Sequence, residues 1–407
     1  MTSIDAHSKI YAWIALLCIP LTGMTIDIYV PSLPNIQHYF QTTSTLTQLS
    51  ITTYLFSFGL FQLIAGALSD SLGRRWPLLI NLALFMVVSF IAVLSSSIYQ
   101  FLGCRFLQGI AMASISVSSV AILPDLFQGK TFLRYMSYTN MVWTLSPILA
   151  PYIGGYLQAY WGWQAPFYFL TIYSFMTFIF ALVGLRETHQ QKIPLNVSQC
   201  LRNYATILKH PFFLGAVVCL ALLYGMVTIF SVVGPFLIQS VLQHSPIVFG
   251  RVALLMGVAI FLGNYSNRLL QRYERPKVTV QIGLIAMIVS CLVLLYFPLR
   301  QQISLYNVSV PIFLLLYSGG LIFPTYFAQN IALFPTLSGS ANAMMGALFI
   351  IGAAVMTGLA AMLRTSTQLP IAVTFLTMSL VCAGIFYGFL RKFPHHNHRD
   401  DDVVRGH

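Results

Sequence analysis

Two charged residues, Asp27 and Arg105, stand out because each lies within a long apolar run of the chain. The other eight of the nine acidic residues fall in the tails or in polar connections, and all nine histidines lie outside the apolar runs. A carboxylate at membrane depth is costly and usually marks an ion or proton pathway. Asp27 is therefore the side chain of the apolar runs that we expect to bind and release protons.

Arg105 is predicted to lie close to Asp27. It falls about seven residues into a run that begins near position 98, and Asp27 precedes the end of its own run by about three residues, so at roughly 1.5 Å per residue both lie in the outer half. A change in the Arg105–Asp27 distance would alter the proton affinity of the carboxyl group. Two simpler interpretations stay open: Arg105 reaches the membrane surface, or Asp27 is a water-exposed acid at a helix end.

The elements that carry these residues are predicted to be transmembrane helices. Charged residues make up 7% of the chain and hydrophobic residues 57%, with a mean hydropathy of +0.79. Continuous apolar runs of about 20 residues are long enough to cross a bilayer and favour helices over a barrel. We expect twelve spans, at about 11–30, 46–68, 76–96, 98–124, 135–159, 165–186, 213–238, 247–269, 278–298, 308–331, 342–363 and 370–391.

The distribution of basic residues predicts the orientation. Seventeen of the 21 Lys and Arg residues fall on one side of these spans, which places both termini in the cytoplasm. The same bias explains the net charge of +12 without nucleic acid as a partner. The longest polar break predicts an N-terminal six-helix bundle over 1–190, a cytoplasmic linker over 191–212, a second bundle over 213–392 and a cytoplasmic tail over 393–407.

A turn after the second span has the most specific spacing. Its residues are Gly66, Asp70, Gly73, Arg74 and Arg75. This turn resembles the signature loop of the major facilitator superfamily. The resemblance implies that Asp70 faces the start of the eleventh helix and latches the two bundles together on the cytoplasmic side. A weaker echo, Gly263-Asn264-Tyr265-Ser266-Asn267, follows the eighth span 197 residues later and is consistent with a duplicated unit.

Three more stretches narrow the resemblance. The segment that begins at Asp27 and ends at Pro34, the pair Arg105 and Gln108, and the helix 5 stripe resemble motifs of twelve-helix drug:proton antiporters in the bicyclomycin/chloramphenicol-resistance branch. The residues of that stripe are Pro147, Pro151, Gly154 and Gly155. The resemblance implies two pseudo-symmetric six-helix bundles, a monomer in the bacterial inner membrane, and alternating access in which substrate leaves in exchange for protons.

The substrate cavity is expected to be lined by aromatic, amide and small polar side chains of the spans. Such sites accept bulky amphipathic molecules with few polar constraints. The candidates are Tyr54, Phe58, Phe61, Gln62, Gln108, Met112, Asn140, Thr144, Tyr224, Tyr317, Tyr326, Gln329 and Asn330.

The predicted function is proton-coupled export of small amphipathic molecules. Neither a Walker-type phosphate loop nor a catalytic or metal-binding cluster occurs in the spans, so no cofactor, no metal and no enzymatic activity are expected. Export of an endogenous metabolite, such as a siderophore or an amino acid, is the main alternative. A proton symporter for nutrient uptake, or a membrane enzyme or receptor, is less favoured. The His- and Asp-containing tail after residue 393 is expected to be solvated.

Overall fold

The computed structural model describes residues 6–189, 196–271, 276–363 and 367–392. Over these residues it is helical and has no strand. Twelve long helices account for the twelve predicted spans. They are α1 (Ala6–Asp27), α3 (Ser44–Leu72), α4 (Arg75–Val93), α5 (Ile98–Leu126), α6 (Gly129–Trp161), α7 (Ala165–Gly184), α9 (Pro211–Pro235), α10 (Pro246–Leu270), α11 (Pro276–Leu299), α12 (Leu305–Ala332), α13 (Ser338–Ala361) and α14 (Leu369–Gly388).

Among the described helices, eleven are long and apolar enough to cross a membrane, and α6 is not one of them. Its first turns carry Lys130 and Arg134, and its middle is rich in Ser, Thr and Asn. The helix nevertheless runs for 33 residues and packs between α1 and α10. We therefore count α6 as the twelfth span.

Short elements complete the two halves of the fold. A 3₁₀ turn, η1 (Val30–Ser32), and α2 (Leu33–Tyr39) follow α1, and α9 continues into a π-helical turn, η2 (Phe236–Val241). Helix α8 (Val197–Leu208) connects the halves and contacts α3, α9 and α13. The hydroxyl of Tyr204 on α8 donates a hydrogen bond to the carbonyl of Leu63 on α3, at 2.7 Å.

The two halves meet closely at the end of the bundle where α1 and α6 finish, which we call the far end. A Cβ atom on Gly155 of α6 would lie 2.7 Å from the carbonyl oxygen of Pro246, and one on Gly250 of α10 would lie 2.7 Å from that of Pro151. Only glycine permits such an approach of two helix backbones. The far end is therefore closed by direct backbone packing between α6 and α10.

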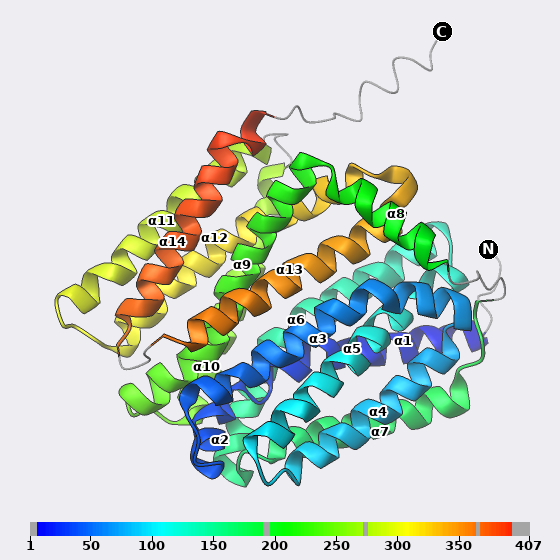
Figure 1. The fold of residues 1–407 in the computed structure, drawn as a ribbon, viewed down its shortest axis with the longest axis horizontal. Helices are drawn as coiled ribbons and strands as arrows, with labels where there is room; N and C mark the ends of the chain where they lie inside the picture. Colours follow the sequence, from blue (N-terminus) through cyan, green and yellow to red (C-terminus); the bar gives the residue numbers. More distant parts are fainter. Residues whose placement is uncertain (1–5, 190–195, 272–275, 364–366, 393–407) are drawn as a thin grey trace.

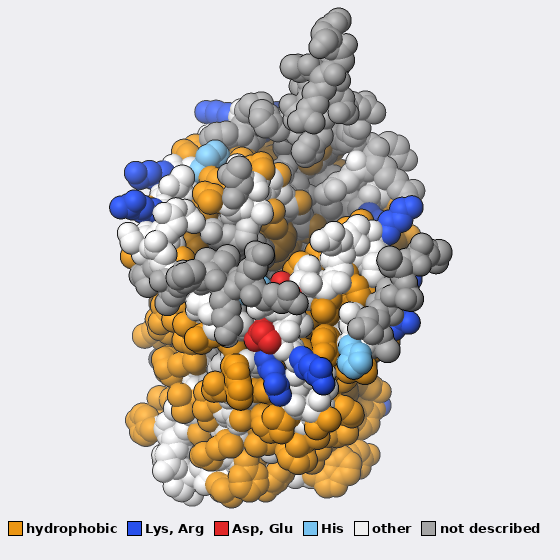
Figure 2. Space-filling model, turned by 90° about the vertical axis from the view of Figure 1, so that its right-hand side faces the viewer, with side chains coloured by type: hydrophobic (Ala, Val, Ile, Leu, Met, Phe, Trp, Pro, Cys, Tyr) orange, Lys and Arg blue, Asp and Glu red, His pale blue; other side chains and the backbone are white. Residues whose placement is uncertain are grey.

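The halves diverge toward the opposite end, which carries Arg74 and Arg75 and which we call the basic end. In Figure 1 the helices of the two halves splay toward the upper right, where α8 crosses. Figure 2 looks onto that side and shows a recess between the halves with hydrophobic side chains inside it. The structure is thus closed at the far end and open at the basic end.

Candidate functional site: a central cavity with one carboxylate

A cavity of about 230 Å³ lies between the two halves. Its walls come from α1, α3 and α6 on one side and from α9, α10, α12 and α13 on the other. Most of the lining is apolar, and its larger aromatic side chains are Phe58, Trp143, Tyr224, Phe230, Phe249, Phe323 and Phe349. A concave, largely apolar site with a few polar groups is typical of small-molecule binding.

Asp27 lines this cavity, and the lining contains no Lys, Arg, His or second carboxylate. It is the last residue of α1, and its Oδ1 accepts a hydrogen bond from the Ser231 hydroxyl of α9, at 3.4 Å. The side chain is partly exposed, because it faces the cavity. One ionisable acid in an apolar chamber can change its charge only by exchanging a proton with whatever water or substrate enters there.

Arg105 is fully buried behind this cavity and does not line it. Its guanidinium carbon lies 4.5 Å from the ring centres of both Tyr29 and Tyr54, a cation–π arrangement on two faces. Its amino groups donate to Gln108 Oε1 at 2.6 Å and to the Thr25 carbonyl at 3.3 Å. Arg105 therefore lies in the protein core and does not reach a membrane surface.

Arg105 contacts the end of the helix that carries Asp27 and makes no ion pair with the Asp27 carboxylate among the described residues. It instead binds the Thr25 carbonyl, two residues before Asp27. Carbonyls in the last turn of a helix carry partial negative charge and attract cations. Arg105 thus stabilises the end of α1 from which Asp27 projects, while the two tyrosine rings hold the guanidinium away from the carboxylate.

Three of the thirteen predicted cavity residues line the cavity: Phe58, Thr144 and Tyr224. Tyr54, Gln108 and Met112 are buried behind it; Gln108 bonds to Ser89 at 2.8 Å, and Met112 accepts from Thr22 at 3.7 Å. Gln108 and Met112 lie behind the wall because α5 packs along α1, α3 and α4, and Tyr54 lies on the face of α3 that contacts Arg105 of α5. Their role in substrate binding stays a prediction.

The remaining seven candidates also lie outside the cavity lining, toward the basic end or in helix–helix contacts. Gln62 packs on Gly346, and the Tyr317 hydroxyl bonds to Ser266 at 2.9 Å. Tyr326 and Gln329 line a smaller crevice beside α11 and α14. The other three are Phe61, Asn140 and Asn330, of which Asn330 is fully buried.

The predicted stripe of small residues on α6 divides into two parts. Pro147 and Pro151 line the cavity, within a helix that continues through both prolines. Gly154 and Gly155 lie beyond it: a Cβ on Gly154 would overlap the Ile28 carbonyl oxygen of the segment after α1. The stripe thus joins the cavity wall to the closed far end of the molecule.

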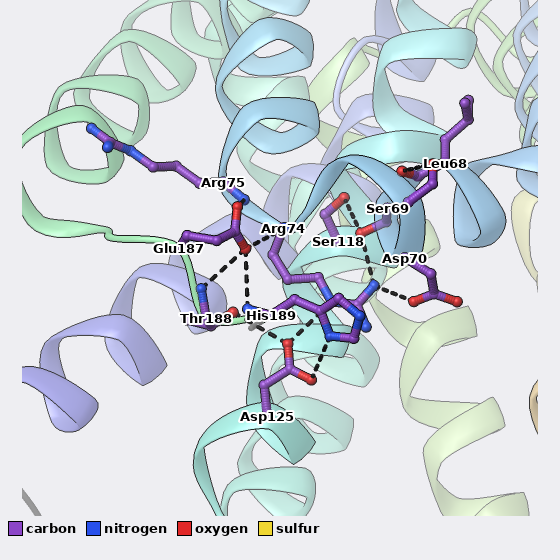
Figure 3. Close-up of polar contacts among 11 residues, drawn as sticks. Leu68, Ser69, Asp70, Arg74, Arg75, Ser118, Asp125, Glu187, Thr188 and His189 are labelled. Atoms are coloured by element: carbon purple, nitrogen blue, oxygen red, sulfur yellow. Dashed lines mark hydrogen bonds and ion pairs between the residues drawn. The ribbon is translucent and has the colours of Figure 1, made fainter. Parts of the chain in front are cut away.

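The turn between α3 and α4 holds a network of charged groups at the basic end (Figure 3). Gly73 has a φ of 94°, a conformation that favours glycine, and the Glu187 carboxylate occupies the place of its missing side chain. Arg74 is buried, pairs with Asp70 and also binds Asp125 at 3.1 Å. The Arg74 amide donates to Glu187 Oε1 at 2.8 Å.

Asp70 makes its ion pair within its own half of the molecule. Its side chain is 44% exposed and contacts Arg74. The predicted latch would place Asp70 against the start of α13, and no such contact occurs between described residues in this open arrangement. The latch stays a prediction, because it concerns the arrangement in which the basic end is closed.

The sequence did not predict several residues of the central cavity and of the charged network around Arg74. Asp125 and Glu187 were recognisable as acids beside basic connections, but their contacts with Arg74 span 51 and 113 residues. Ser231 and Trp143 carried no signal, because a single serine or tryptophan in an apolar helix is ordinary. Only the packing of α9 and α6 around α1 brings these two side chains to the cavity.

The geometry matches a family of known proteins. The model of the Major Facilitator Superfamily matches residues 15–357 of the chain. The chain belongs to this superfamily. It is 27% identical over 385 residues to multidrug resistance protein D of Escherichia coli, covering 93% of this chain and 95% of that protein.

Other relatives carry related names. The chain is 28% identical to a chloramphenicol resistance protein of Pseudomonas aeruginosa, covering 90% of this chain and 87% of that protein. The crystal structure of a D-xylose–proton symporter superposes with a TM-score of 0.74 at 14% identity, over 93% of this chain and 97% of the other. At that identity the structural likeness supports the fold. The superfamily fold of two six-helix bundles that we predicted is thereby confirmed.

Proposed function

We propose that this protein exports small amphipathic molecules across the bacterial inner membrane in exchange for protons. The observation that carries the proposal is Asp27, the one carboxylate in the lining of an apolar and aromatic cavity that contains no basic side chain. The names of the relatives, multidrug resistance protein D and chloramphenicol resistance protein, support an uncharged or weakly charged drug-like substrate. We further propose that the protein works as a monomer.

In this proposal the basic end faces the cytoplasm, as do both termini, which is the orientation that the Lys and Arg bias favours. Substrate that enters the cavity from the basic end displaces the proton of Asp27, so that Asp27 is ionised while substrate is bound. Closure of the basic end and opening of the packed α6–α10 contact would expose Asp27 to periplasmic water. Protonation there would weaken the bound state and release substrate, and the proton would leave on the cytoplasmic side after the protein reverses.

Arg105 has a defined part in this cycle. It neutralises the negative end of α1 through the Thr25 carbonyl, and so it favours the ionised form of a carboxylate at that helix end. Movement of α5 relative to α1 would remove this stabilisation. We propose that such a movement accompanies the change of access and alters the proton affinity of Asp27.

The test is proton release by the purified protein. Chloramphenicol added to weakly buffered protein should release about one proton per molecule bound if Asp27 is protonated when the cavity is empty and ionised when it is filled. A pH-sensitive dye measures the release, and Asp27→Asn provides the matched control. Binding without proton release in the native protein would contradict the antiport mechanism.

The alternative, export of an endogenous metabolite, rests on the same cavity and cycle. An assay of ligand-induced thermal stabilisation with phenicols, lipophilic cations, amino acids and siderophores separates the two. Stabilisation by amino acids or siderophores alone would favour the metabolite. The described spans give no separate support to an import role or to an enzymatic one.

A further inference from the structure

Ser231 connects the carboxylate of one half of the molecule to a helix of the other half. Asp27 ends α1 in the N-terminal half, and Ser231 lies on α9 in the C-terminal half. The Ser231 hydroxyl donates to Asp27 Oδ1 at 3.4 Å, and both side chains line the cavity. This hydrogen bond therefore crosses the interface that must open and close during transport.

The surroundings of Asp27 make this bond sensitive to its ionisation. The titratable groups near Asp27 are Tyr29, Tyr54 and Tyr224. Arg105 lies against the rings of Tyr29 and Tyr54 and outside the cavity lining. None of them forms an ion pair with Asp27 in the described structure. A hydroxyl donates a stronger hydrogen bond to a carboxylate than to a protonated acid. At 3.4 Å the Ser231–Asp27 bond is long for a hydroxyl donor, and it is stronger while Asp27 is ionised than after Asp27 is protonated.

A second hydrogen bond joins the continuation of α9 to the segment formed by the end of α1 and η1. The side chain of Gln239, in the π-helical turn η2, donates to the Pro31 carbonyl at 2.9 Å. Between Ser231 and Gln239 the helix changes from α to π after Pro235, and such turns are common at functional sites. One attachment of α9 depends on a carboxylate, and the other depends on a backbone carbonyl that cannot titrate.

We propose that Ser231 is a positioning residue through which the C-terminal half detects the ionisation of Asp27. With Asp27 ionised, the hydrogen bond holds α9 against the end of α1. Protonation weakens it and leaves Gln239 as the remaining polar attachment, so that the two halves can rearrange around the cavity. The inference rests on the proposed function, because it requires Asp27 to be the proton site.

The experiment compares Ser231→Ala with Ser290→Ala in proteoliposomes with chloramphenicol as the probe. Ser290 is the matched control: it is buried on α11, and its hydroxyl bonds within its own helix, to Ala286. We expect Ser231→Ala to lower pH-gradient-driven accumulation about tenfold, within the range of coupling energies between sites. Because Ser231 lines the cavity, chloramphenicol exchange without a pH gradient should also fall, but by a smaller factor than accumulation. Ser231→Thr, which keeps the hydroxyl, should restore accumulation.

A double substitution separates coupling from a plain substrate contact. If Ser231 acts through Asp27, then adding Ser231→Ala to Asp27→Asn should change exchange no further. Gradient-driven accumulation by Ser231→Ala equal to that of Ser290→Ala would overturn the inference, and so would equal loss of accumulation and exchange with Ser231→Ala. If Asp27→Asn itself still accumulates substrate, the proposed proton site is wrong and the role of Ser231 is excluded with it. If Ser231→Ala accumulates substrate normally while Asp27→Asn does not, Asp27 remains the proposed proton site and only the role of Ser231 is overturned.

Discussion

The residues at the end of α3 and those at the end of α10 occupy equivalent places in the two halves, and the described residues at these two ends are held by different chemistry. Asp70 and Arg74 are four residues apart, as are Asn267 and Gln271 in the second half. The first pair is ionic and extends to Asp125. In the second, Asn267 donates to the Leu321 carbonyl at 2.6 Å and accepts from Gln271 at 2.8 Å.

This difference bears on the predicted latch at Asp70, which stays a prediction. The side-chain amide of Asn267 is 2% exposed and is bonded to α12 on one side and to Gln271 on the other. By contrast, the side chain of Asp70 is 44% exposed and pairs with Arg74, which also binds Asp125. The ionic contacts of Asp70 are the ones that the predicted latch would exchange when the basic end closes, whereas Asn267 joins α10 to α12.

The largest effect is expected from Arg74→Ala. Without the guanidinium, Asp125 loses a charged partner and Asp70 loses its ion pair, which should cost about 2 kcal/mol of stability, in the range for hydrogen bonds to charged groups. Transport should fall more than tenfold, since the turn also positions α3. Gln271→Ala is the control in the other half and should cost less, about 1 kcal/mol. Thermal unfolding of the purified proteins measures both, and equal losses would remove the distinction between the turns.

The comparison can be sharpened by transferring the ionic pair to the second half. Asn267→Asp places a carboxylate at a buried site and removes the donor to the Leu321 carbonyl, so stability should fall by roughly 2 kcal/mol. Adding Gln271→Arg supplies a cation four residues away and should recover about half of that loss. Thermal unfolding of the two single variants and the double variant measures the coupling, and strict additivity would show that the transferred pair does not form.

Asp70→Asn tests the latch at constant size. The substitution keeps a hydrogen-bonding group next to Arg74 on a partly exposed turn, so stability should change by less than about 1 kcal/mol. Transport should fall severalfold, because an amide is a weaker partner than a carboxylate for the start of α13. Expression, thermal unfolding and chloramphenicol export, measured on one preparation, show whether the substitution lowers transport or stability. Native transport would exclude a latch role for Asp70.

The smallest effect is expected from Arg75→Ala, immediately beside Arg74. The Arg75 side chain is at the surface and bonds to the Leu182 carbonyl at 3.3 Å. Exposed contacts of this kind contribute up to about 0.5 kcal/mol. Stability and export should both stay near native values. A loss as large as that of Arg74→Ala would mean that the total positive charge of the turn matters more than its buried ion pairs.

Much of the fold could be predicted from hydropathy and length. Each predicted span overlaps one long helix, and the two differ at their ends. Helix α3 starts at Ser44 because the Thr43 hydroxyl accepts a hydrogen bond from the Leu46 amide, and it continues to Leu72 before Gly73. The α6 span was harder, since its polar residues lower its hydropathy. The tail after residue 392 lies outside the described residues.

The site was predicted less completely, for physical reasons. An isolated acid in an apolar run identified Asp27 because burying charge is costly. The interactions of Arg105 with two tyrosine rings, and of Asp27 with a serine 204 residues away, depend on how α5 and α9 pack. Aromatic and amide residues repeat along every helix of the chain. Their types alone could not indicate which ones face the cavity.

The central claim is that Asp27 carries the transported proton, and its most direct test is accumulation of chloramphenicol driven by a pH gradient. Purified native protein and Asp27→Asn are placed in proteoliposomes, and binding is measured in parallel. With one titrating carboxylate, about one proton should exchange for each neutral molecule, so transport should move one net charge. Asp27→Asn should still bind, since the amide can form hydrogen bonds, but should not accumulate substrate against its gradient. Full accumulation by Asp27→Asn would contradict the account.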